Sequence, residues 1–103
     1  MKIIDLTAKT FKKEVLQSDL PVLVDFNASW CPPCQALHPI LEDLADETDS
    51  FKIATVDIDA EPELAAAYGV STIPCLVAFR DGEEFDRRTG LQPKRRLIKM
   101  MEK

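Results

Sequence analysis

Two cysteines separated by two prolines are the side chains best suited to chemistry in this 103-residue chain. They lie in the segment Trp30-Cys31-Pro32-Pro33-Cys34, between an apolar, strand-like run and a long helical pattern. On the first turn of a helix the two sulfurs are close enough to form a disulfide, so the spacing favours redox chemistry. The alternative, half of a structural zinc site, needs two further ligands, and the chain has no second cysteine pair of this kind and only one histidine.

The two cysteines are not equivalent, because only one of them precedes a proline. A residue before proline avoids helical geometry, which makes Cys31 the expected helix cap, with Pro32 and Pro33 in the first turn. The free N–H groups and the dipole at a helix N-terminus stabilise a thiolate there. We therefore expect Cys31 to be the exposed, reactive sulfur and Cys34 to point inward.

A single carboxylate, Asp25, interrupts the apolar run of residues 22–26. A run of this kind is typical of a central strand that is covered on both faces. Burial of an unpaired carboxylate is costly, so we expect the pKa of Asp25 to rise until the group is partly protonated near neutrality. Such a group can shuttle protons beside the cysteines. The alternative is an aspartate at a strand end that backbone donors satisfy.

Strand-like and helix-like stretches alternate along the chain, which is typical of an α/β protein. Residues 3–6 indicate a short edge strand, and Thr7 is a candidate N-cap for a helix that buries Phe11 and Val15. The order βαβαβαββα predicts a central mixed sheet with helices on both faces, and it places Trp30 at the carboxyl end of a central strand, where sites cluster. The other expected elements are strands at 22–26, 51–58, 75–79 and 85–89, helices after Trp30, from about 61 and from about 93, and a hairpin turn at 81–82.

The length, composition and net charge of the chain predict one acidic globular domain that spans residues 1–103. The net charge of -5 and the pI near 4.8 disfavour nucleic acid and anionic membrane surfaces as partners, and the basic residues 94–96 are explained as a solvated helix face. No apolar run approaches the roughly 20 residues of a membrane span, and the N-terminus has no secretory pattern, so we expect a cytoplasmic protein. Three cysteines are also too few for a secreted disulfide framework.

These features together resemble the thioredoxin family along nearly the whole chain. The resemblance rests on an ordered set of landmarks and is more specific than the cysteine pair alone. It implies the thioredoxin fold and a thiol-disulfide oxidoreductase that reduces disulfide bonds in other proteins. The landmarks are Val22-Leu23-Val24-Asp25-Phe26, Trp30-Cys31-Pro32-Pro33-Cys34, Pro39, Val56-Asp57-Ile58-Asp59, Tyr68-Gly69-Val70, Ile73-Pro74, Asp81-Gly82 and Gly90.

The resemblance implies a role for each residue of the catalytic centre. Cys31 would attack the substrate disulfide, Cys34 would resolve the mixed disulfide, and Asp25 would accept the proton of Cys34. No cofactor is expected, because the three glycines are scattered singly and form no dinucleotide-binding motif. Electrons would therefore come from another protein, which the resemblance implies is a thioredoxin reductase, and we expect the chain to work as a monomer.

The resemblance also implies a surface that holds an extended substrate beside the disulfide. Pro74 would be a cis-proline facing the cysteines, and its loop would present backbone and apolar atoms to the substrate. The expected substrate-binding residues are Trp30, Pro32, Pro33, Ile73, Pro74 and Gly90.

Besides Cys75, which is considered below, three positions depart from the family's pattern near the expected site. Pro32 replaces a glycine, which removes a backbone N–H and stiffens the loop. Proline after the first cysteine also occurs in glutaredoxin-like and more oxidising members, so the resemblance implies a reduction potential above the thioredoxin value of about -270 mV. Asn27 stands where a second tryptophan is common, which reduces apolar cover over the site. Thr55 replaces a lysine, which leaves Asp25 with one cation fewer and should raise its pKa further.

Cys75 follows the expected cis-proline at a position where threonine is usual. It is either a small buried apolar residue or a third sulfur within reach of Cys31 and Cys34. In the second case it could form an alternative disulfide or complete an iron–sulfur or zinc site. A further alternative for the whole chain is a docking module that uses the same groove, with the cysteine pair incidental.

Overall fold

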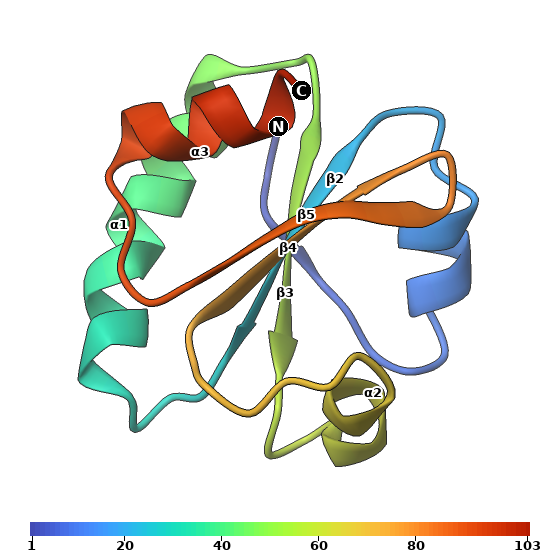
Figure 1. Cartoon of the computed structure of the whole chain (residues 1–103), viewed down its shortest axis with the longest axis vertical. Coiled ribbons are helices and arrows are strands. Elements are labelled where there is room, and N and C mark those ends of the chain that lie inside the picture. Colours follow the sequence, from blue (N-terminus) through green and yellow to red (C-terminus); the bar gives the residue numbers. More distant parts are fainter.

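A five-stranded mixed sheet runs through the middle of the protein, with helices on both of its faces (Figure 1). The structure is a computed structural model that describes residues 1–103. Its elements are β1 (Ile4–Asp5), the π-helical turn η1 (Lys12–Leu16), β2 (Val22–Asn27), α1 (Pro32–Glu47), β3 (Lys52–Asp57), α2 (Pro62–Ala67), β4 (Cys75–Arg80), β5 (Glu83–Thr89) and α3 (Lys94–Met101). The strand order is β1-β3-β2-β4-β5, in which the first three are parallel and the β2-β4 and β4-β5 pairs are antiparallel. The predicted element order and mixed sheet are confirmed.

Strand β2 lies at the centre of the sheet, and its alternate side chains fill two separate cores. Val24 and Phe26 pack on the face that η1 and α2 cover, within one cluster of buried residues. Leu23 packs on the opposite face, with leucines of α1 and Leu97 of α3. The same alternation turns the side chain of Asp25 toward α1, the helix that begins at the cysteine pair.

The segment before β2 differs from the predicted helix with Thr7 as its cap. A turn comes first, and η1 begins only at Lys12, without a side-chain cap. Thr7 begins that turn: its backbone N–H donates to Thr10 Oγ1 (3.0 Å), and its carbonyl accepts from the N–H of Phe11 (3.0 Å). The apolar face is as predicted, since Phe11 and Val15 are both buried.

The hairpin between β4 and β5 has the turn that the Asp81-Gly82 pair predicts. The two residues have positive φ, 54° and 81°, as a type I′ turn requires. Gly82 also lies against the end of η1, where an added Cβ would be 3.0 Å from the carbonyl oxygen of Leu16. This position therefore needs glycine for its backbone conformation and for the space beside it.

Gly82→Ala is expected to lower the free energy of unfolding by more than Gly69→Ala does. Both glycines have positive φ, so each alanine incurs a backbone penalty of about 1–2 kcal/mol. Only at Gly82 would the new Cβ also press on backbone, because nothing lies within 4 Å of a Cβ at Gly69. Denaturant unfolding of the two variants measures the difference, and equal losses would contradict the close approach to Leu16.

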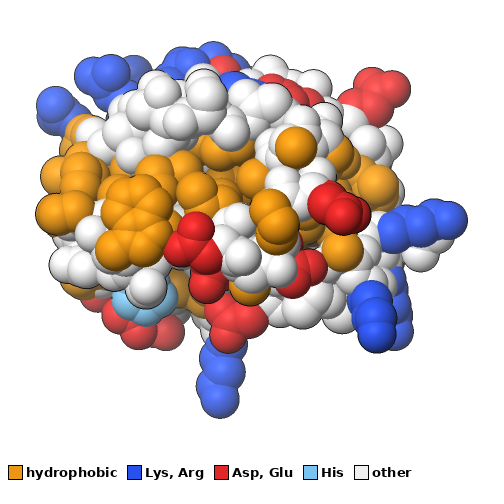
Figure 2. Space-filling model, turned by 90° about the horizontal axis from the view of Figure 1, so that it is seen from below, with side chains coloured by type: hydrophobic (Ala, Val, Ile, Leu, Met, Phe, Trp, Pro, Cys, Tyr) orange, Lys and Arg blue, Asp and Glu red, His pale blue; other side chains and the backbone are white.

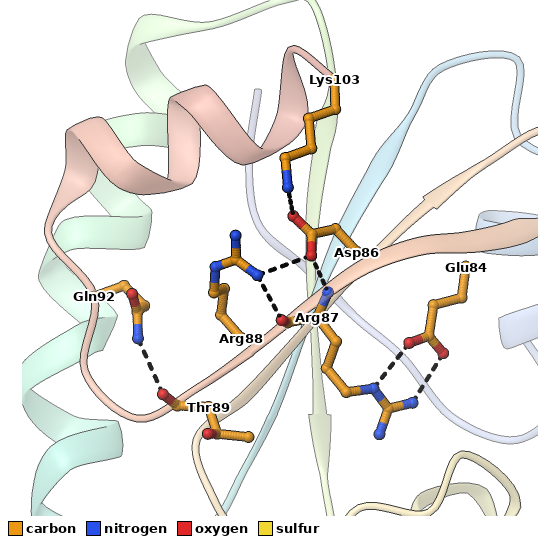
Figure 3. Close-up of polar contacts among 7 residues, drawn as sticks. All are labelled: Glu84, Asp86, Arg87, Arg88, Thr89, Gln92 and Lys103. Atoms are coloured by element: carbon orange, nitrogen blue, oxygen red, sulfur yellow. Dashed lines mark hydrogen bonds and ion pairs between the residues drawn. The ribbon is translucent and has the colours of Figure 1, made fainter.

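Charged side chains brace the edge strand β5 (Figure 3). Arg87 donates two hydrogen bonds to Glu84, at 2.8 and 2.9 Å. Asp86 accepts from Arg88 at 2.9 Å and from Lys103 at 2.7 Å, which ties the C-terminal residue to the strand. Charges along an edge strand discourage pairing with a strand of another chain. This edge of the sheet is therefore a poor template for strand addition.

Candidate active site

Cys31 caps the N-terminus of α1, as the proline after it predicts. Its backbone is extended, at φ -92° and ψ 111°, and Pro32 and Pro33 occupy the first helical positions. The Cys31 sulfur accepts a hydrogen bond from the backbone N–H of Cys34, with Sγ and N 3.3 Å apart. Because neither proline carries an N–H, Cys34 supplies the first amide donor of the helix. This donor and the helix dipole would stabilise a negative charge on Cys31 Sγ.

The structure corrects the expectation that Cys31 is exposed. Cys31 is only 4% exposed and Cys34 5%, so both residues are buried. They form a small apolar cluster with Ala28, against which Ile58 and Ile73 pack. Ile73, which is expected from the sequence only as a substrate contact, also covers Cys31, and its carbonyl oxygen lies 4.0 Å from Cys31 Sγ. The two thiols are therefore distinguished by the helix cap and not by their exposure.

Asp25 is buried on the α1 side of the sheet, with 1% of its surface exposed. Burial raises its pKa from 3.8 to about 7, as predicted from the sequence. The alternative of a carboxylate satisfied by backbone donors is wrong. The only hydrogen-bond partner of the carboxyl group is the side-chain amide of Asn27, with Nδ2 3.2 Å from Oδ2, and Oδ1 has none. Asp25 can therefore both accept and release a proton near neutral pH.

Asp25 and Cys34 line the same pocket, between the end of β2 and the first turns of α1. The pocket has a volume of about 250 Å³, and Asn27 and His38 also line it. Burial and the neighbouring sulfur of Cys31 raise the pKa of Cys34 to about 12, so Cys34 is a thiol at neutral pH. Its deprotonation needs a nearby base, and Asp25 is the only carboxylate in the lining of this pocket.

The loop before β4 lies beside the cysteine pair. The Ile73–Pro74 peptide bond is cis, as the resemblance implies. The Pro74 carbonyl accepts a hydrogen bond from the N–H of Gly90 (2.8 Å), which brings the loop after β5 to the same place. The structure thus gathers Ile73, Pro74 and Gly90 next to Cys31. Pro74 itself is buried, whereas Ile73 and Gly90 are partly exposed.

Trp30 provides the largest exposed apolar surface at the site. It is 64% exposed, and its indole N–H donates to Asp59 Oδ2 at 2.8 Å. Pro32 and Pro33 are exposed as well. Hydrophobic side chains gather in a band across this face of the molecule, with acidic side chains beside them (Figure 2). The six residues expected to bind substrate therefore all lie around the cysteine pair.

The whole chain is similar to proteins of known family. The family profile described as Thioredoxin matches residues 2–103. The chain belongs to the thioredoxin family. It is 45% identical over 95 residues to the thioredoxin of Rickettsia bellii, an alignment that covers 91% of this chain and 90% of that protein. It is 41% identical over 99 residues to thioredoxin 1 of Synechococcus elongatus, which covers 95% of this chain and 92% of that protein.

A solved structure agrees with this membership. A mutant thioredoxin from Halobacterium salinarum is 39% identical and superposes with a TM-score of 0.88, covering 98% of this chain and 88% of that chain. The predicted thioredoxin fold is confirmed, and the chain is accordingly a thiol-disulfide oxidoreductase. Its partners, as a class, are disulfide-containing proteins and a reductase. None of the helices combines the length and the apolar character that a membrane span requires.

The third cysteine of this thioredoxin-family chain lies apart from the redox pair. Cys75 begins β4 opposite Phe26 of β2 and is buried in the core on the η1 and α2 face. Cys31 and Cys34 belong to a different cluster, and no three His, Cys, Asp or Glu side chains are placed to hold a metal ion. The alternative of a metal site built on the three cysteines does not fit this arrangement, because Cys75 packs into the core as a small apolar residue does.

Cys75→Ala is expected to leave the rate of disulfide reduction within about twofold of the wild-type rate. Burial raises the pKa of Cys75, which makes this thiol a weak nucleophile. The variant should lose about 1 kcal/mol in the free energy of unfolding, because a small cavity remains in the core. Steady-state rates and denaturant unfolding measure the two effects, and a large loss of rate would contradict this placement of Cys75.

The thioredoxin-family landmarks do not reveal two polar contacts of the site. Asn27 is expected from the sequence only to reduce apolar cover, yet its amide is the partner of Asp25. A signal exists, because residues i and i+2 of a strand share a face. Gln35 braces the loop before the cysteine pair, since its amide donates to the carbonyl of Ser29 (2.7 Å). No pattern in the sequence marks that contact.

Proposed function

We propose that this protein reduces disulfide bonds of other proteins, with Cys31 as the nucleophile, Cys34 as the resolving thiol and Asp25 as the base. The observation that carries the proposal is the difference between two environments at one helix end. Cys31 Sγ accepts the first amide donor of α1, whereas Cys34 shares a pocket with a carboxyl group whose pKa is about 7. Cys31 is thus suited to attack the substrate disulfide, and Cys34 is suited to be deprotonated later, in the second step.

The proposed reaction has two steps. The Cys31 thiolate attacks one sulfur of the substrate disulfide, a mixed disulfide forms, and the first substrate thiolate leaves and takes a proton from water. Asp25 then removes the proton of Cys34, and the new thiolate attacks Cys31 Sγ and displaces the second substrate thiolate. The substrate gains two electrons, and the protein ends with a disulfide between Cys31 and Cys34.

The face around the cysteine pair suits an extended peptide segment. Exposed apolar side chains adjoin the pair in sequence, and the partly exposed Ile73 packs against it. Because Pro74 is buried, its part is to hold the backbone of Ile73 beside Cys31 rather than to offer its own ring. The residues proposed to contact or frame the substrate are Trp30, Pro32, Pro33, Ile73, Pro74 and Gly90.

The oxidised protein needs electrons from a partner before the next cycle, and the proposed donor is a thioredoxin reductase. The proposed compartment is the cytoplasm, because three cysteines are too few for the disulfide framework of a small secreted protein. We expect a monomer, because few large apolar side chains are exposed on the surface. Two of them, Trp30 and Leu91, border the proposed substrate site.

The proposed function is tested with pre-reduced protein freed of all other reductant. The substrate is a peptide dimer joined by a disulfide, whose fluorescence is quenched until the disulfide is reduced. We expect each equivalent of protein to reduce about one equivalent of this dimer. The Cys31→Ser, Cys34→Ser double variant should release none. An equal yield from the double variant would overturn the proposal, and a double variant that still performs the biological role would favour the docking module.

A further inference from the structure

We propose that Asn27 is a positioning residue for Asp25, and that its side-chain amide lowers the pH at which Cys34 can be deprotonated. The inference rests on the roles proposed above for Asp25 and Cys34. Asn27 Nδ2 lies 3.2 Å from Asp25 Oδ2 and 3.2 Å from the backbone carbonyl oxygen of Asp25. Contacts from one nitrogen to both groups orient the amide toward the carboxylate.

The position of Asn27 in the fold makes this contact possible. Asn27 ends β2 on the same face as Asp25, and it lines the pocket of about 250 Å³ that Asp25 shares with Cys34. A donor to a carboxylate stabilises the charged form over the protonated one. The hydrogen bond from Asn27 therefore opposes the rise in the pKa of Asp25 that burial causes.

On the helix side, no group donates to the carboxylate of Asp25. Cys34 and His38 of α1 line the pocket with it, and no lysine or arginine does. Cys34 is the acid whose proton Asp25 is proposed to take. His38 is exposed and lies 3.7 Å from Glu42, one turn further along the helix. None of these side chains can replace the amide of Asn27.

The strands beside β2 also leave this carboxylate without a partner. Thr55 of β3 lies opposite Asp25, but its hydroxyl donates to a carboxylate of β1 at 2.9 Å. Asp57 of β3 lies opposite Asn27 and accepts a backbone N–H from the loop that follows. Leu76 is the residue of β4 opposite Asp25. With no cation from any neighbouring element, Asn27 is the one group that favours the carboxylate form.

The test compares wild-type protein with Asn27→Leu, which keeps the number and branching of the side-chain heavy atoms and removes the donor, and with Asn27→Ala. In both variants the titration midpoint of Asp25, followed by ¹³C NMR of its carboxyl carbon, should rise by about one pH unit. The acid limb of the pH profile for release of the second substrate thiol should move up equally. Release is then about tenfold slower below the midpoint and unchanged at high pH.

Two results would overturn the inference. The first is an unchanged midpoint in Asn27→Leu; if Asn27→Ala alone shifts the midpoint, the cause is lost packing and not the lost donor. The second is a rate that falls equally at every pH. In the Asp25→Asn background, Asn27→Leu should leave the pH profile unaltered, and a further shift there would also count against it. Failure of the proposed function can be told apart from failure of this inference. In that case the wild-type protein would reduce no disulfide at any pH, while the titration midpoint of Asp25 would still rise in the Asn27 variants.

Discussion

Cys34→Ser is expected to stop disulfide reduction after its first step and to leave one substrate chain bound to Cys31. A serine hydroxyl does not displace a thiolate from a disulfide, so the mixed disulfide persists and turnover falls by roughly a thousandfold or more. The hydrogen bond that caps Cys31 Sγ comes from the backbone of residue 34 and survives the change. Intact mass should show one adduct per protein.

Cys31→Ser is the matched control and should form no adduct. Burial alone would not predict this order, because the two residues are 4% and 5% exposed. The order follows from the helix cap, where the backbone N–H of residue 34 donates to Cys31 Sγ, and from the raised pKa of Cys34. An adduct on Cys34 in the Cys31→Ser variant, at a yield equal to that of Cys34→Ser, would reverse the proposed roles.

Asp25→Asn is expected to stabilise the fold by an amount that grows with pH. The pKa of Asp25 is raised by burial from 3.8 to about 7, so folding favours its protonated form. The stability that this proton provides is complete below pH 3.8 and is lost as the pH rises to about 7. At about 1.4 kcal/mol per pKa unit, the loss amounts to about 4 kcal/mol. Asparagine has nearly the shape of the protonated carboxyl and no charge, so the variant escapes this loss.

Denaturant unfolding at about pH 4 and about pH 8 measures the effect, and the advantage of Asp25→Asn should grow by about 4 kcal/mol between them. Asp49→Asn is the control, because Asp49 is exposed and outside every ion pair, and its difference from wild type should not grow. Asp25→Asn should also slow disulfide reduction by about a hundredfold. Greater stability without slower reduction would contradict Asp25 as the base.

The sequence predicts most of the fold because its strongest patterns have one structural solution. The run at 22–26 has no polar face except at Asp25, so it belongs to a strand covered on both sides, and β2 is that strand. The proline after Cys31 makes this residue the helix cap. The Asp81-Gly82 pair predicts a hairpin turn, because both residue types tolerate the positive φ that the turn has. In each case a local steric rule agrees with the tertiary structure.

The parts that could not be predicted depend on contacts between distant segments. The cover over Cys31 comes from Ile73, which is far along the chain and whose loop is placed by the whole sheet. The turn at Thr7 depends on which of several nearby hydroxyl and backbone groups pair, a choice between similar energies. The Asn27 contact was within reach, since strand alternation places it beside Asp25.

The central claim is a two-electron couple formed by Cys31 and Cys34 alone. The most direct measurement equilibrates the protein in graded mixtures of reduced and oxidised dithiol, alkylates the free thiols and counts them by intact mass. We predict that two thiols are lost together in one transition with a midpoint above about -270 mV, while Cys75 stays free. No transition, or one in which peptide mapping places Cys75 in the bridge, would contradict the account.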